Sequence, residues 1–142
     1  MFGLFRKKKA SIQEHLKELV NKPNTDFQLD VIRNKDVDFQ IIRQRMIKGF
    51  DTTITVNNPE GFSIMISFNP NTDIGLLRYS KFKASKIYDL FKEIKNMDET
   101  FLFFYLKCEN NLKTILNFIH KIQTEVYGYT DDTYYYFKFK EI

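Results

Sequence analysis

The spacing of hydrophobic residues changes several times along this chain, and each change marks a predicted element. Ser11 and Glu14 form a capping box, in which the serine oxygen accepts a backbone N–H and the glutamate reaches back. The apolar residues that follow at helical spacing are Ile12, Leu16, Leu19 and Val20. This pattern predicts an N-terminal helix that ends before Pro23.

Four sets of alternating apolar residues come next, and each predicts a strand with one buried face. The sets are Phe27, Leu29 and Val31; Val37, Phe39 and Ile41; Phe50, Thr52, Ile54 and Val56; and Phe62, Ile64, Ile66 and Phe68. A strong turn signal at residues 57–61 separates the last two sets. Together the sets predict an antiparallel meander, and residues 74–82 could form either a further strand or a loop.

The second half of the chain returns to helical spacing. The apolar residues Ile87, Leu90, Phe91 and Ile94 predict a helix over about residues 83–96. An unbroken apolar run at 101–106 predicts a strand that is buried on both faces and therefore central. A third helix is predicted over residues 112–122, opened by Asn110 or Asn111 and stopped by Gly128. Residues 134–139 are predicted as the last strand.

The predicted order of elements is α-β-β-β-β-α-β-α-β. Such an order is typical of the α+β class, here a two-layer sandwich with three helices on a mainly antiparallel sheet of five to six strands. At 142 residues the chain fits one domain, which we place at residues 10–142.

The net charge of +4 comes from a short N-terminal segment. Arg6, Lys7, Lys8 and Lys9 supply four of the 22 cations, so the rest of the chain carries 18 basic and 18 acidic side chains. We expect residues 1–9 to form a basic, flexible tail that keeps the protein in solution. Contact of this tail with an anionic membrane or with nucleic acid is the alternative.

Cysteine content and hydropathy indicate a cytoplasmic protein. Cys108 is the single cysteine, so an internal disulfide cannot form. No apolar stretch approaches the roughly 18 residues of a membrane span, and the N-terminus does not have the layout of a secretory signal.

Cys108 and His120 are the obvious candidates for catalysis, because a thiol nucleophile needs a neighbouring base. Cys108 ends a predicted strand and His120 lies on the helix that follows. His120 and His15 flank the apolar stripes of their helices, so we expect both to be half-buried and to serve packing. The sequence has no spacing typical of a metal site and no phosphate-binding loop, so we expect no cofactor and no enzymatic activity.

Two groups of cations are candidates for nucleic-acid binding. The first group is Arg43, Arg45 and Lys48, and the second is Lys81, Lys83, Lys86, Lys92 and Lys95. Acidic residues lie among the second group, and the domain body is neutral. Nucleic acid is therefore the less favoured partner.

Aromatic residues near the C-terminus are the strongest functional hint. Tyrosine is enriched in protein interfaces because it offers a large rigid area and a hydroxyl. We select five candidate partner-binding residues here: Tyr129, Asp131, Asp132, Tyr134 and Tyr136. An ordinary aromatic ladder between strands is the alternative.

In its size and in its strand–helix–strand end, from Phe101 to Phe139, the chain resembles the small immunity proteins that bacteria pair with polymorphic or contact-dependent toxins. The resemblance implies a non-catalytic cytoplasmic domain that neutralises a toxin by direct binding. The selected tyrosines and acids would then meet a basic toxin cleft. A secretion-type chaperone or adaptor, or a weak nucleic-acid-binding protein, is the alternative. The pattern does not predict the oligomeric state.

Overall fold

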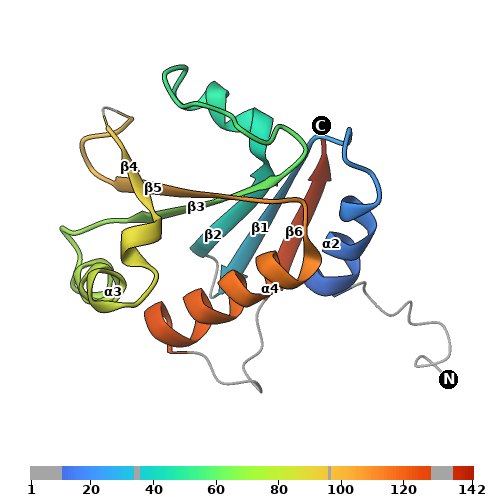
Figure 1. The fold of residues 1–142 in the computed structure, drawn as a ribbon. Helices are drawn as coiled ribbons and strands as arrows, with labels where there is room; N and C mark the ends of the chain where they lie inside the picture. Colours follow the sequence, from blue (N-terminus) through green and yellow to red (C-terminus); the bar gives the residue numbers. More distant parts are fainter. Residues whose placement is uncertain (1–10, 34–35, 96, 129–135) are drawn as a thin grey trace, which may run out of the picture.

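Six antiparallel strands form one open sheet in the order β4-β5-β3-β2-β1-β6 in this computed structural model (Figure 1). The strands are β1 (Phe27–Arg33), β2 (Asp36–Arg43), β3 (Phe62–Phe68), β4 (Lys92–Ile94), β5 (Leu102–Cys108) and β6 (Tyr136–Glu141). The structure describes residues 11–33, 36–95, 97–128 and 136–142. The expected basic tail at 1–9 lies outside these ranges.

The described residues form three α-helices in addition to the sheet: α2 (Ile12–Val20), α3 (Asp73–Ala84) and α4 (Leu112–Lys121). A π-helical turn, η3 (Ile122–Val126), extends α4. The 3-10 turn η1 (Gln44–Gly49) lies between β2 and β3, and the 3-10 turn η2 (Tyr88–Leu90) lies between α3 and β4. Each α-helix begins at a side-chain cap, because the oxygens of Ser11, Thr72 and Asn111 accept backbone N–H groups of the first turn. In the described chain no helix combines the length and the apolar content that a bilayer crossing requires.

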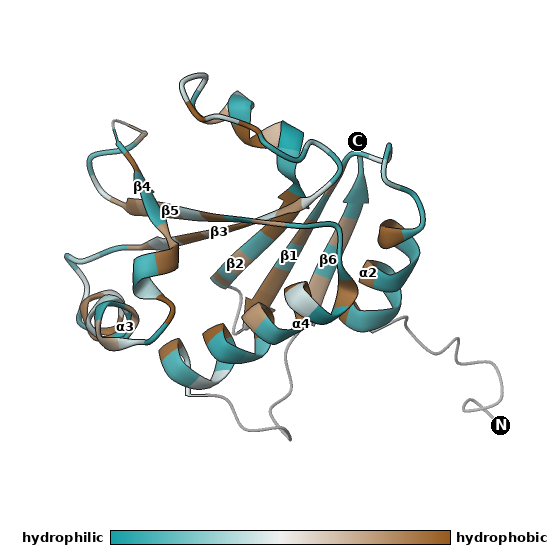
Figure 2. Cartoon of the chain, in the orientation of Figure 1, coloured by the Kyte–Doolittle hydropathy of each residue, from teal (hydrophilic) through white to brown (hydrophobic). Residues whose placement is uncertain are grey.

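The main core lies between the sheet and the three helices. Alternate strand residues such as Leu29, Ile41 and Ile64 pack there against helix residues such as Leu16 and Ile115. Figure 2 shows the matching alternation of apolar and polar bands along α4. A smaller cluster on the opposite face contains Ile42, Ile47, Ile54, Met65, Ile94 and Tyr105. Because successive strand residues face opposite sides, the sheet is apolar on both faces at β2, β3 and β5.

The predicted α+β class, with six strands and three helices, is confirmed. The strand predicted from Phe50 to Val56 is wrong, because η1 and a turn-rich segment occupy this part of the chain. Side chains satisfy its backbone instead of a ladder: the Asp51 carboxylate accepts the N–H of Thr53, and Lys107 donates to the carbonyl of Thr55. Strand β2 therefore pairs directly with β3.

The second helix lies earlier than predicted. Residues 73–84 form α3, so the segment at 74–82 is neither a strand nor a loop. Within the predicted helix at 83–96, η2 is followed by the short strand β4, which pairs with β5. Helix α3 carries apolar residues around its whole circumference, so it lacks the one-sided stripe that identified the other two helices.

The remaining predictions are largely confirmed. Strand β5 is paired on both sides, with β4 and β3, although it is second in the sheet rather than central. It is buried on both faces, since Phe104 and Leu106 belong to the main core and Tyr105 to the smaller cluster. Asn111 caps α4 as expected, and Gly128 follows the helical region with φ of 68°.

Candidate protein-docking site

A groove of about 460 Å³ lies where β2 begins, β3 ends and α3 begins. Antiparallel pairing brings the first two together, because Phe39 near the start of β2 is opposite Ile66 near the end of β3. The groove walls include Val37 from β2, Ile74 from α3 and Phe101, which precedes β5. We call this feature the α3 groove.

The walls of the α3 groove expose apolar side chains. Val37 is 43% exposed, Ile74 is 54% exposed and Phe101 is 39% exposed. Leu77, 51% exposed, lies three residues beyond Ile74 and therefore on the same side of α3. Isolated exposed apolar residues are ordinary, but a contiguous group around a hollow is typical of an interaction site.

Two residues that line the α3 groove, Arg78 and Tyr127, form polar contacts with β2. Nη1 of Arg78 lies 3.8 Å from Oδ1 of the buried Asp38. The guanidinium of Arg78 also lies over the ring of Tyr127, 5.2 Å from its centroid, which is a cation–π arrangement. The Tyr127 hydroxyl donates a hydrogen bond of 2.5 Å to the backbone oxygen of Asp38. These contacts therefore join helix α3, strand β2 and the end of the α4 region beside the groove.

Local backbone features place the groove walls. In η3 the N–H of Tyr127 bonds to the carbonyl of Ile122, five residues earlier, and this π-type turn sets where the tyrosine leaves the helix. At the start of α3, Gly75 lies so close to the preceding turn that an added Cβ would be 1.9 Å from the backbone oxygen of Asn69. Only glycine allows this approach.

The apolar surface continues around the end of the sheet. Val37 also lines a second hollow of about 130 Å³, together with Phe50, Met65 and Phe103. Phe50 is 39% exposed, so the second hollow again presents an aromatic side chain to solvent. The two hollows share Val37 and Ser67, so they adjoin each other.

Of the five partner-binding residues chosen from sequence, Tyr136 lies within the described residues. Tyr129, Asp131, Asp132 and Tyr134 lie outside the described residues. The backbone of Tyr136 opens β6, where it pairs with Ile32 of β1.

The thiol of Cys108 is buried at the end of β5. Burial raises the pKa of this thiol to about 12, so at neutral pH it carries its proton and is a poor nucleophile. His120 is exposed on α4, which corrects the expectation that it is half-buried. His15 is half-buried as expected, and its ring stacks on Phe139 with centroids 4.6 Å apart.

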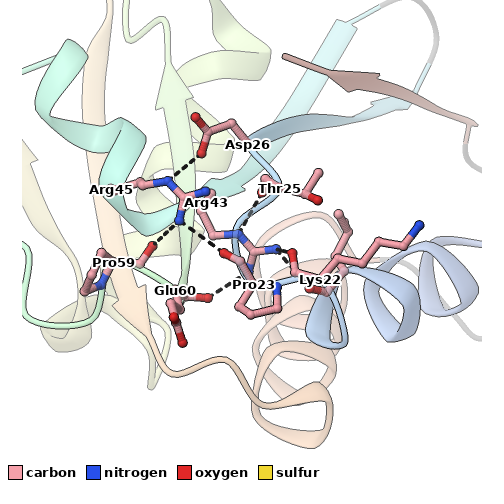
Figure 3. A network of polar contacts seen from close by, with 9 residues as sticks. Lys22, Pro23, Thr25, Asp26, Arg43, Arg45, Pro59 and Glu60 are labelled. Carbon is pink, nitrogen blue, oxygen red and sulfur yellow. Dashed lines mark hydrogen bonds and ion pairs between the residues drawn. The ribbon is translucent and has the colours of Figure 1, made fainter.

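Two of the cations considered for nucleic-acid binding instead hold the protein's own backbone (Figure 3). The side chain of Arg43 is fully buried between the rings of Phe27 and Phe62. Its guanidinium donates hydrogen bonds of 2.7–3.0 Å to the carbonyls of Leu19, Lys22, Thr25 and Glu60. Burial and the neighbouring charge of Arg45 lower the pKa of Arg43 to about 10, which leaves it charged at neutral pH.

Arg45 is engaged in a similar way. Its Nε lies 2.6 Å from Oδ1 of Asp26, and its Nη1 donates to the carbonyls of Pro23 and Pro59 (Figure 3). Neither arginine is available to track phosphates, so the predicted basic cluster at 43–48 is reduced to Lys48. Neither the alternation of residues nor the charge along the chain indicates these internal roles.

Sequence reasoning also missed the α3 groove, although Ile74, Leu76 and Leu77 form an apolar group within residues 74–82. Within the described ranges, no three His, Cys, Asp or Glu side chains come together as a metal site. The arrangement suits contact with another macromolecule: apolar walls, one arginine and one tyrosine. Comparisons with protein-family models, with curated proteins and with solved structures found no match.

Proposed function

We propose that this chain is a non-catalytic cytoplasmic domain that binds another protein through the α3 groove, and that its partner is a bacterial toxin that it neutralises. The observation that carries the proposal is the group of exposed apolar side chains in the groove lining, Val37, Ile74 and Phe101, with the exposed Leu77 beside Ile74 on α3. The general make-up of the chain, which resembles toxin-immunity proteins, gives the partner class.

The composition of the groove matches the anatomy of protein interfaces. Such interfaces have an apolar centre enriched in aromatic residues and arginine, surrounded by a polar rim. Here Phe101, Tyr127 and Arg78 supply the aromatic and arginine side chains of the lining, and Asp36 and Thr72 supply polar ones. Covering the apolar walls would remove them from water, which is favourable in proportion to the area buried.

The state of the thiol also favours binding over nucleophilic chemistry. Cys108 is buried in the main core, and its raised pKa keeps it protonated. A thiol nucleophile needs access to substrate and a lowered pKa, and Cys108 has the opposite of both.

The proposal is tested by affinity capture, in which the purified chain serves as bait and a variant altered only at the groove is compared with wild type. Wild type, an Ile74→Asp/Leu77→Asp variant and a Leu90→Asp control are used to capture partners from the native host. Leu90 is 49% exposed on η2, so the control adds a charge at a similar exposed site outside the groove lining. A stoichiometric partner should bind wild type and the control, and should be lost with the groove variant.

A captured partner must then be shown to be a toxin. Expression of the partner alone should stop bacterial growth, and co-expression of the wild-type chain should restore it. Restored growth with the groove variant would contradict the proposed surface. Alanine at Tyr134, Tyr136, Asp131 and Asp132 tests the sequence-derived surface in the same assay, and unchanged protection would remove those residues from the proposal.

A secretion-type chaperone is the second candidate, because such proteins also present apolar grooves to their clients. A chaperone of this kind should dimerise, whereas an immunity protein need not. Light scattering of the purified chain separates the two: a monomer favours neutralisation, and a dimer favours the chaperone.

A further inference from the structure

Strand β6 is the last strand of the sheet, and all six of its residues, from Tyr136 to Glu141, pair with β1. In the described part of the chain no strand pairs with its other side. We call this side the β6 edge. An unpaired edge presents a row of backbone N–H and C=O groups that can form hydrogen bonds with an added strand.

The two faces of β6 differ in chemistry. Lys138 and Lys140 lie exposed on one face. Phe137 and Phe139 lie on the other face, where both contact the ring of His15 from α2. The two phenylalanines are only half-buried, so the core remains partly open to solvent at this edge.

The positive charges of Lys138 and Lys140 are not neutralised by an acidic side chain of the described residues. Lys138 is opposite Asp30 of β1, but the Asp30 carboxylate accepts hydrogen bonds from Gln28 and Gln40, over 3.0 and 2.9 Å. Among the described residues neither Lys138 nor Lys140 forms an ion pair. A strand added at the β6 edge would bring its own side chains next to both ammonium groups.

We propose that the β6 edge binds an extended segment of a partner protein in which acidic and apolar residues alternate. Backbone hydrogen bonds would supply affinity, as in other cases of strand addition. The acidic side chains would lie beside Lys138 and Lys140, and the apolar ones beside Phe137 and Phe139. This surface is separate from the α3 groove, so the inference goes beyond the proposed function.

A second copy of this chain is a poor occupant of the same edge. Two β6 strands would pair antiparallel about a two-fold axis. In such a pair the lysine faces of the two strands would lie on the same side of the joined sheet. The two longest pairings of this kind place Lys138 opposite either Lys138 or Lys140 of the other copy. Like charges directly opposite each other are destabilising, and edge lysines are a common protection against self-pairing.

Two synthetic eight-residue peptides test the proposal, one alternating Glu with Val and the other alternating Lys with Val. Their binding to the full chain is measured by fluorescence anisotropy. We expect the Glu peptide to bind at least about tenfold more tightly than the Lys peptide. The double substitution Lys138→Glu/Lys140→Glu should reverse this preference, and Lys138→Gln/Lys140→Gln should abolish it.

Matched controls separate this edge from other surfaces. Lys92→Glu on β4, the opposite edge of the sheet, should leave the preference unchanged, as should Ile74→Asp in the α3 groove. A Glu peptide with N-methylated backbone amides should lose binding, because its amides cannot donate to a strand.

Three results would overturn the proposal: equal affinity for the two peptides, a preference that survives charge reversal, or a dimer of the wild-type chain that Lys138→Glu disrupts. The groove variant Ile74→Asp leaves the β6 edge intact, and the lysine variants leave the α3 groove intact. A negative result in the peptide assay can therefore be distinguished from a negative result for the proposed function.

Discussion

Nη2 of Arg43 donates a hydrogen bond of 2.9 Å to the carbonyl oxygen of Leu19, so the last residue of β2 holds the last turn of α2. Helix C-termini leave carbonyls without partners inside the helix. The same guanidinium bonds to the carbonyl of Lys22, beyond the helix, and to that of Glu60, just before β3. One side chain therefore joins segments that are far apart in sequence.

The first prediction concerns the geometry of this guanidinium. Arg43→Lys keeps the positive charge, but a single ammonium group cannot donate to all the carbonyls that surround the planar guanidinium. Buried carbonyls would lose their donors, and we expect the free energy of unfolding to fall by about 2–4 kcal/mol. Urea denaturation measures the change.

Arg45→Lys is the matched control for that prediction. Arg45 is partly exposed and its main partner, Asp26, is 40% exposed at its side chain. Exposed ion pairs contribute little, so the loss should stay within about 1 kcal/mol. Equal losses for the two variants would show that Arg43 acts through its charge alone and not through its set of carbonyl contacts.

The second prediction concerns Gly75 in the first turn of α3. Alanine is about 1 kcal/mol better than glycine in a helix interior, so propensity alone predicts stabilisation. The added Cβ would, however, meet the backbone oxygen of Asn69 at 1.9 Å. We expect Gly75→Ala to lower the thermal midpoint and to weaken partner binding, because α3 must move away from the turn at residue 69.

Gly49→Ala provides the comparison, since a Cβ at Gly49 meets nothing within 4 Å. Its thermal midpoint should stay the same or rise slightly. An increase of the thermal midpoint in both variants would mean that the turn before α3 can move without a loss of stability.

The helices that sequence predicted correctly are those in which local signals and burial agree. Ser11 caps α2 and Asn111 caps α4, and each helix buries one apolar stripe. The alternation in β1, β2 and β3 was equally informative, because one face of each strand packs in the main core.

The errors arose where tertiary contacts overrule the local pattern. Phe50 and Ile54 alternate as in a strand, yet Ile54 packs in the smaller cluster while Phe50 lies at the surface. Helix α3 was missed because Ile74 and Leu77 are exposed while Phe82 is buried, so its apolar residues do not share one face. Side chains that leave the core for a partner surface remove the periodicity by which a helix is recognised.

The candidate site was harder to predict than the fold. Arg43 and Arg45 have the composition of a basic patch, and only their long-range carbonyl contacts define their role. The α3 groove joins Val37, Ile74 and Phe101, which lie on three separate elements. No local pattern in the sequence can indicate that these residues meet.

The third prediction concerns alkaline pH. Burial raises the pKa of the Cys108 thiol from 9.0 to about 12, so the folded protein keeps this proton where the unfolded chain loses it. The unfolded state then binds fewer protons, and stability falls as the pH rises above about 9. Between about pH 8 and pH 10 this thiol should lower the free energy of unfolding by about 1.4 kcal/mol.

The Cys108→Ala variant isolates that contribution. Its stability at pH 8 should be lower, because it leaves a small cavity, but its decline between pH 8 and pH 10 should be less steep by the same amount. Urea denaturation at both pH values gives the two slopes. Identical slopes would show that the thiol ionises in the folded state as easily as in the unfolded state.

The fourth prediction separates the two sides of α3. Phe82 is fully buried and its ring contacts those of Phe68, Phe91 and Phe104, with centroids 5.1 Å away in each case. Phe82→Ala should therefore reduce the free energy of unfolding by about 3–5 kcal/mol. Leu77 on the opposite side is half exposed, and Leu77→Glu should change stability by less than about 0.5 kcal/mol.

Partner binding should respond in the reverse way. Leu77→Glu places a charge at the rim of the apolar surface, so titration calorimetry with the captured partner should show a loss of at least about tenfold in affinity. Phe82→Ala, measured under conditions where it remains folded, should retain most of the affinity. If Leu77→Glu instead destabilised the fold and left binding intact, α3 would be a core helix on both sides, and the α3 groove would lose its assigned role.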